Sequence, residues 1–150
     1  MHEVRDAVVL DLFAGSGGLG IECLSRGARH VDFVDNNKKV CLHLKAQLEQ
    51  LGAQGYRVSH ANAQEFLRRT ERCYSLVFLD PPFASEFVEQ TLNQLRATNV
   101  LLPGALIYCE FSKSSAEPEV STELTLKRSG KAGESSFRLY QYLCESEDTL

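Results

Sequence analysis

Short apolar runs, rich in β-branched and aromatic residues, alternate along this chain with segments whose apolar residues recur at helical spacing. The runs occupy residues 8–12, 31–35, 56–60, 75–79 and 105–111. Strands that alternate with helical crossovers form a parallel sheet with helices on both faces. Two further β-rich runs, 124–128 and 137–143, predict a C-terminal hairpin with antiparallel pairing. The sequence therefore predicts an α/β, Rossmann-like fold on a mostly parallel seven-stranded sheet.

The segments between the predicted strands carry helical patterns. The first helix follows a glycine-rich turn and begins at Ile21. In the second, apolar residues recur at helical spacing up to a terminating Gly52, at Val40, Leu44, Leu48 and Leu51. Helices over 63–70 and 85–97 follow, and Pro103-Gly104 predicts a turn before the fifth strand.

The composition fits a single domain over residues 1–150, because the length is near the common domain size and 43% of the residues are apolar. The formal net charge of −4 gives no overall signature of a nucleic-acid-binding protein. Basic residues nevertheless cluster in two places, on the third helix and around the hairpin loop: Arg68, Arg69 and Arg72, and Lys127, Arg128 and Lys131. Such clusters more often form a solvated face than an RNA contact.

Five cysteines and four histidines show no spacing typical of a metal site or a disulfide framework. We interpret the cysteines as reduced thiols that mostly pack as small apolar side chains. No apolar stretch reaches the length of about eighteen residues that a membrane span needs, and no secretory leader is visible. The sequence predicts a cytoplasmic protein without a metal ion or a membrane segment.

The first predicted strand contains Asp11 and leads into a turn with Gly15, Gly17 and Gly20. Glycines permit positive φ and a close approach of the backbone to a ligand, and the helix start behind them offers unpaired N–H groups. The second strand ends in Asp35, about twenty residues later, where a ribose-binding carboxylate belongs in such folds. The pattern predicts a nucleotide-type cofactor, and the glycine spacing also leaves nicotinamide or flavin binding open.

Both acids have simpler interpretations as well. Asp35, or one of the asparagines at 36 and 37, is suited to cap the following helix. Asp11 can serve as a strand-end residue whose side chain bonds the glycine loop.

The tetrapeptide Asp80-Pro81-Pro82-Phe83 follows the fourth apolar run. Two successive prolines remove two backbone donors and fix two φ angles, so the segment forms a rigid corner at the end of a buried strand. The corner offers a carboxylate, carbonyl groups and an aromatic ring. These groups suit a nucleobase that donates hydrogen bonds from an amino group and stacks its ring. Taken alone, the segment also fits a stiff loop.

These motifs, in their order and spacing, resemble those of class I S-adenosylmethionine-dependent methyltransferases that act on an exocyclic amino group. The chain is most similar to the RsmD-type enzymes, which methylate guanine N2 in 16S ribosomal RNA of the small subunit. The similarity rests on the run from Asp11 to Gly17, on Asp35, on the Asn62-Ala63 step, on residues 80–83, and on Ala105-Leu106-Ile107-Tyr108 and residues 137–141.

The resemblance implies a cofactor, S-adenosylmethionine, and a set of site residues. Cofactor contacts are expected from Asp11, Phe13, Gly15, Gly17, Asp35, Asn62 and Ala63. Asp80, Pro81, Pro82 and Phe83 are expected to hold the guanine. The implied partner is 16S ribosomal RNA, within the small subunit or an assembly intermediate. Family members usually begin some tens of residues earlier, so we interpret this chain as lacking the usual N-terminal extension. A second acid that some relatives have after the ribose carboxylate is Asn37 here.

Three other functions stay open. An adenine-N6 DNA methyltransferase would use the same tetrapeptide. A dinucleotide-dependent oxidoreductase would share the glycine turn and Asp35, but it has no need of the Asp-Pro-Pro-Phe corner. A cofactor-binding fragment without turnover would bind S-adenosylmethionine and methylate nothing.

Overall fold

The computed structural model describes residues 4–81, 85–112 and 117–143. Within these residues the chain forms seven strands and four helices. The strands are β1 (Val8–Asp11), β2 (His30–Asp35), β3 (Tyr56–His60), β4 (Tyr74–Leu79), β5 (Leu101–Ser112), β6 (Leu124–Ala132) and β7 (Ser135–Tyr142). The helices are α1 (Gly18–Ser25), α2 (Lys38–Gln50), α3 (Ala63–Arg69) and α4 (Ser85–Ala97).

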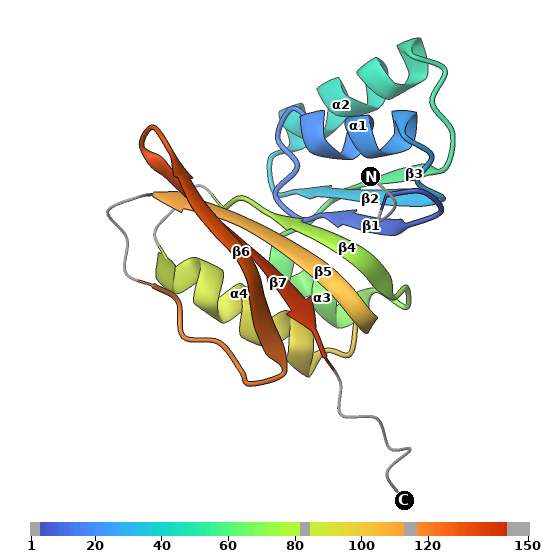
Figure 1. The fold of residues 1–150 in the computed structure, drawn as a ribbon. Coiled ribbons are helices and arrows are strands. Elements are labelled where there is room, and N and C mark those ends of the chain that lie inside the picture. The colour runs from blue at the N-terminus through green and yellow to red at the C-terminus, as the bar shows by residue number, and fades with distance from the viewer. Residues whose placement is uncertain (1–3, 82–84, 113–116, 144–150) are drawn as a thin grey trace, which may run out of the picture.

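The strands form one sheet in the order β3-β2-β1-β4-β5-β7-β6 (Figure 1). Strands β1 to β5 pair in parallel, and β7 is antiparallel to both β5 and β6. The order reverses at β1, because the chain first builds outward to β3 and then returns to the other side of β1. The connections that leave β1 and β4 therefore diverge, and open α/β sheets generally bind ligands outside the carboxyl ends of the strands at such a point. The predicted fold is confirmed.

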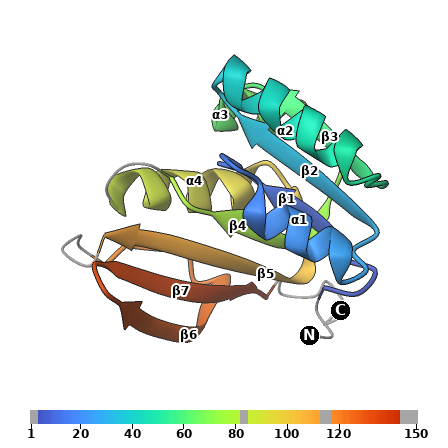
Figure 2. The same cartoon turned by 90° about the horizontal axis from the view of Figure 1, so that it is seen from above.

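Helices cover both faces of the sheet, α1 and α2 on one side and α3 and α4 on the other (Figures 1 and 2). Alternation along the strands supplies the two cores. Phe33 of β2 shares a buried cluster with Leu44 of α2, whereas the next residue, Val34, belongs to the cluster that contains Leu67 of α3 and Leu92 of α4. Because β2 buries side chains on both faces, it lies between the two helical layers.

Several boundaries differ from the sequence-based expectation. Helix α1 begins at Gly18, so Gly20 lies inside the helix. Leu51 follows α2 and is exposed, because it lies in the turn where the helix ends. Pro103 and Gly104 lie within β5, where the register with β4 shifts, and do not form a separate turn. Most of the stretch 129–136 is strand, because β6 and β7 pair almost to the turn at Gly133.

None of the helices among the described residues is long and apolar enough to cross a membrane. No group of three or more histidine, cysteine or acidic side chains in the described part of the chain is arranged to hold a metal ion.

Candidate active site

Three carboxylates lie at the carboxyl ends of neighbouring parallel strands. Asp11 is the last residue of β1, Asp35 is the last residue of β2, and Asp80 directly follows β4. Since β1 lies between β2 and β4, all three belong to one edge of the sheet, at the point where the strand order reverses. Besides burial, charge repulsion from Asp80 and from Asp35 raises the pKa of Asp11, so both acids lie within electrostatic reach of Asp11.

Asp11 is buried, with 4% of its surface exposed. Its Oδ2 accepts a hydrogen bond of 3.2 Å from the Gly20 N–H, as expected of a residue that bonds the glycine loop. Burial raises the pKa of Asp11 from 3.8 to about 7, and the hydrogen bond from Gly20 opposes this rise. No cationic side chain among the described residues forms an ion pair with it. A buried acid without a positive partner is costly, and a ligand ammonium group would supply the missing charge.

The glycines of the turn have different roles. A Cβ at Gly17 would collide with the Leu44 side chain, and one at Gly20 would collide with the Phe33 ring, so both positions are closed by packing. Gly15 adopts a φ of 54°, but a Cβ there would meet nothing within 4 Å. The turn therefore has its open side at Gly15, on the edge that carries the three acids. This space is where a ligand can approach the backbone.

Asp35 fixes the turn from the neighbouring strand. Its Oδ2 accepts from the Gly15 N–H at 3.0 Å, and its Oδ1 accepts from the Asn37 N–H at 2.9 Å. The cap of α2 is Asn37, whose side-chain oxygen accepts from the Val40 N–H at 3.1 Å. Asp35 is therefore not the helix cap. A carboxylate offers about four acceptor sites, so these two bonds leave capacity for ligand hydroxyl groups.

The structure also describes three other predicted cofactor contacts. Asn62 caps α3, with its Oδ1 accepting from the Glu65 N–H at 2.8 Å, and it is exposed. Ala63 is buried in the first turn of α3. Phe13 is half-buried and packs edge to face against Phe87 of α4, with 5.6 Å between ring centroids. Structural roles are thus evident for Asn62 and Phe13, and a cofactor role for either remains a prediction.

Only part of the predicted catalytic tetrapeptide is described. Asp80 is exposed at the end of β4, and partial burial of its carboxyl group raises its pKa. Pro81 is buried. Pro82 and Phe83 lie outside the described residues. The structure therefore places the carboxylate and the first proline at the same sheet edge as Asp11 and Asp35.

Two residues of β5 lie near Asp80: Tyr108, which belongs to a run that the family resemblance includes, and Glu110, which the sequence did not single out. Burial raises the pKa of Tyr108 and of Glu110 in β5, and charge repulsion from Asp80 adds to both shifts. The sequence did contain one signal, an acid near the end of an otherwise apolar strand. Its meaning depends on β5 being the neighbour of β4, which the sequence pattern does not specify.

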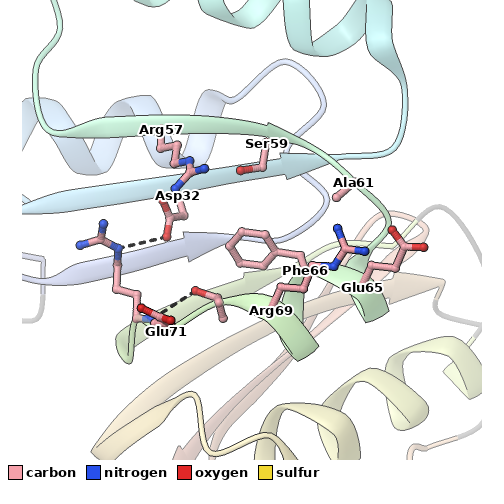
Figure 3. Close-up of a pocket in the computed structure, with 10 residues that line it drawn as sticks. Asp32, Arg57, Ser59, Ala61, Glu65, Phe66, Arg69 and Glu71 are labelled. Atoms are coloured by element: carbon pink, nitrogen blue, oxygen red, sulfur yellow. Dashed lines mark hydrogen bonds and ion pairs between the residues drawn. The ribbon is translucent and has the colours of Figure 1, made fainter.

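A separate pocket of about 650 Å³ lies between β3 and α3 (Figure 3). Arg57 and Ser59 of β3 and Phe66 and Arg69 of α3 contribute to its walls. The buried carboxylate of Asp32 also lines it and is bonded by His30, Arg72 and Tyr74, at 2.7, 3.3 and 2.6 Å respectively. None of the predicted site residues lines this pocket. It is therefore distinct from the sheet edge that carries Asp11, Asp35 and Asp80, which we call the acid edge. Arg72 lies beyond the end of α3, although the sequence placed it on that helix, and it forms an ion pair with Asp32.

Comparison with known proteins agrees with this geometry. The family described as Conserved hypothetical protein 95 matches residues 1–141. Ribosomal RNA small subunit methyltransferase D of Escherichia coli K12 is 38% identical over 144 residues, which cover 96% of this chain and 73% of that relative. The chain belongs to the ribosomal RNA small subunit methyltransferase D family. The member from Haemophilus influenzae is also 38% identical, over 94% of this chain and 75% of that relative. The solved structure of the Escherichia coli protein yhhF superposes on the present chain with a TM-score of 0.90 at 37% identity, over 95% of this chain and 80% of yhhF.

Proposed function

We propose that the chain is an S-adenosylmethionine-dependent methyltransferase that modifies the exocyclic N2 of a guanine in 16S ribosomal RNA. The observation that carries this proposal is the meeting of Asp11, Asp35 and Asp80 around the open side of the glycine turn. Membership of a family whose named relatives are small-subunit ribosomal RNA methyltransferases supports it. The catalytic domain is residues 1–150, and a ribosomal substrate implies a cytoplasmic site of action.

The residues at the acid edge fit the chemistry of S-adenosylmethionine. The unpaired buried charge of Asp11 suits an ammonium group, and Asp35 suits ribose hydroxyls. The remaining contacts would come from the turn and from the residues around it, namely Phe13, Gly15, Gly17, Asn62 and Ala63. When bound, the cofactor supplies an electrophilic methyl group on a positively charged sulfur.

Asp80 has the central chemical role in this mechanism. The lone pair of guanine N2 is delocalised into the ring, so the amino group must be held where it can become pyramidal. Hydrogen bonds accepted by the Asp80 carboxylate and the Pro81 carbonyl favour the positive charge that grows on N2 as it gains the methyl group. N2 then loses one proton, for which Asp80 is the adjoining acceptor. Its raised pKa suits that role. Stacking by Phe83 remains a prediction.

Two measurements on this chain test the proposal. Calorimetric titration with S-adenosylhomocysteine, with NAD as control, should give saturable binding to the homocysteine compound alone. Incubation with the methyl donor and small ribosomal subunits, followed by mass spectrometry of the nucleosides, should yield N2-methylguanosine. Binding to NAD alone would overturn the proposal. N6-methyladenosine would redirect it to an adenine substrate, and cofactor binding without transfer to any nucleic acid would indicate a binding module.

The Asp80→Ala variant tests whether Asp80 acts in methyl transfer and not in cofactor binding. Asp80 serves the acceptor base in this mechanism, and its side chain bonds no described residue of the cofactor turn. Transfer should therefore fall by at least about a thousandfold, while S-adenosylhomocysteine affinity stays within a few-fold. An equal loss of cofactor affinity would mean that Asp80 holds the cofactor and not the base.

A further inference from the structure

Asp80 has a neighbouring acid on the next strand. Leu79 of β4 is paired with Cys109 of β5. Asp80 is the next residue after Leu79, and Glu110 is the next residue after Cys109. Parallel strands lie about 4.8 Å apart, so consecutive residues beyond a paired position remain neighbours. Cys109 points into the buried core, and alternation places Glu110 on the opposite face. Glu110 is paired with Phe137 of β7, which closes its other side.

Neither acid has a protein donor in the described part of the chain. The side chains of Asp80 and Glu110 take part in none of the hydrogen bonds or ion pairs found among the described residues. Glu110 is half-buried, and burial together with repulsion from Asp80 raises its pKa. Two adjoining carboxylates without donors destabilise each other in the folded protein. A ligand that brings two adjacent donors would relieve both.

The aromatic residues around Glu110 restrict where such a ligand can lie. The ring of Tyr108 stacks on Phe137, with 5.9 Å between centroids and 22° between planes. The same tyrosine meets Phe78 edge to face at 6.2 Å. These contacts hold the β4, β5 and β7 side chains on this face in one packed arrangement. The acids at the end of the face are therefore presented from a fixed surface.

Guanine carries two adjacent donors of this kind. Its N2 amino group and its N1–H lie side by side on the Watson–Crick edge, whereas adenine has an acceptor at N1. We propose that Glu110 accepts the N1–H of the target guanine while Asp80 accepts from the N2 amino group, so that Glu110 selects guanine over adenine. This inference rests on the proposed function. An ionised carboxylate that faces adenine N1 would leave two acceptors opposed, which a buried site rejects strongly.

The Glu110→Gln variant and a modified RNA test this role together. The substrate is an RNA whose methylated guanine has been located by mass spectrometry, and its partner is the same RNA with 2-aminopurine at that position. 2-Aminopurine keeps the 2-amino group but has an acceptor at N1. Wild-type protein should prefer guanine by about a hundredfold or more in kcat/KM. The glutamine amide can donate to N1, so the variant should lose about thirty-fold on guanine and reduce the preference to within about fivefold.

Controls separate this outcome from a general loss. Glu49→Gln changes an exposed acid on α2 and should leave both rates unchanged. Both variants should bind S-adenosylhomocysteine within about twofold of wild type. If Glu110→Gln does not fold, Glu110→Asp keeps the charge but withdraws it by one methylene, and it should reduce the guanine rate while retaining the preference. An equal fall on guanine and 2-aminopurine overturns the role of Glu110. Cofactor binding without transfer to any guanine overturns the proposed function instead.

Discussion

Replacing Asp11 with asparagine keeps an acceptor for the Gly20 N–H but removes a buried charge. The folded-state pKa of about 7 lies above the ordinary value of 3.8, so ionised Asp11 opposes folding more strongly as the pH rises between these values. Near about pH 4, Asp11→Asn and wild type should have the same free energy of unfolding. At about pH 8 the free energy of unfolding of the variant should be larger by roughly 2–4 kcal/mol. Urea unfolding at the two pH values measures this difference.

The same variant should bind the cofactor less well, because the charge that opposes folding is the one proposed to pair with an ammonium group. S-adenosylhomocysteine affinity should fall about tenfold or more in Asp11→Asn at about pH 8. Wild-type affinity should itself decline as the pH drops through about 7, where Asp11 becomes protonated, and the variant should lack this decline. Glu71→Gln, at an exposed acid outside the acid edge, is the control. A stabilised variant with undiminished affinity would remove the ammonium contact from the mechanism.

At the scale of the elements, the glycine turn makes two separable contributions. Gly17 and Gly15 both have positive φ, 77° and 54°, but only Gly17 is closed in by a neighbouring side chain, Leu44. Gly17→Ala should therefore destabilise the fold by about 2–4 kcal/mol, and Gly15→Ala by about 1 kcal/mol. Cofactor affinity should fall more than about tenfold in Gly15→Ala, whose new methyl group enters the open space. Thermal unfolding and titration of the folded variants distinguish the two effects, and a reversed pattern would place the ligand beside Gly17.

Local sequence pattern was enough to predict most elements, since each strand or helix carries its own periodicity. The expected helix 85–97 coincides with α4. The differences arise where a partner strand decides the boundary. Pro103 and Gly104 are turn residues by composition, yet β5 begins at Leu101 because that residue pairs with Tyr74 before the register shifts. The glycine-rich stretch after Arg128 is strand because β7 pairs with it.

At the scale of the whole molecule, strand order and register explain which site residues could be predicted from the sequence. Asp11, Asp35 and Asp80 were predicted because each stands at the end of its own buried strand or directly after it, so each is marked by local pattern. Their meeting at one edge follows from parallel strands in adjacent positions. Glu110 was missed for the opposite reason. It is significant only as the neighbour of Asp80, and that relation depends on strand order and register between segments about thirty residues apart.

The acids at this edge and the net charge of −4 disfavour contact with a polyanion, so the phosphates of the proposed RNA substrate would need basic residues elsewhere. Lys127, Arg128 and Lys131 lie on β6 itself, the outer strand of the sheet. Lys131 pairs with Ser136, which pairs with Phe111, the residue after Glu110. The basic end of β6 therefore lies at the same end of the sheet as the proposed site, three strands away from Asp80.

If β6 contacts the phosphates of the proposed RNA substrate, binding should depend on salt through about three basic residues. The logarithm of the affinity should fall with the logarithm of salt concentration with a slope of about −2 to −3. Changing Arg128 and Lys131 together to glutamine should reduce the magnitude of the slope by about 1 to 2. Arg68 and Arg69 are the matched pair, because they lie in the last turn of α3 and the chain then returns to the opposite end of the sheet. Filter binding across a salt series measures the slopes. If the slope became smaller in the variant with Arg68 and Arg69 changed, and stayed the same in the variant with Arg128 and Lys131 changed, the RNA would lie on α3.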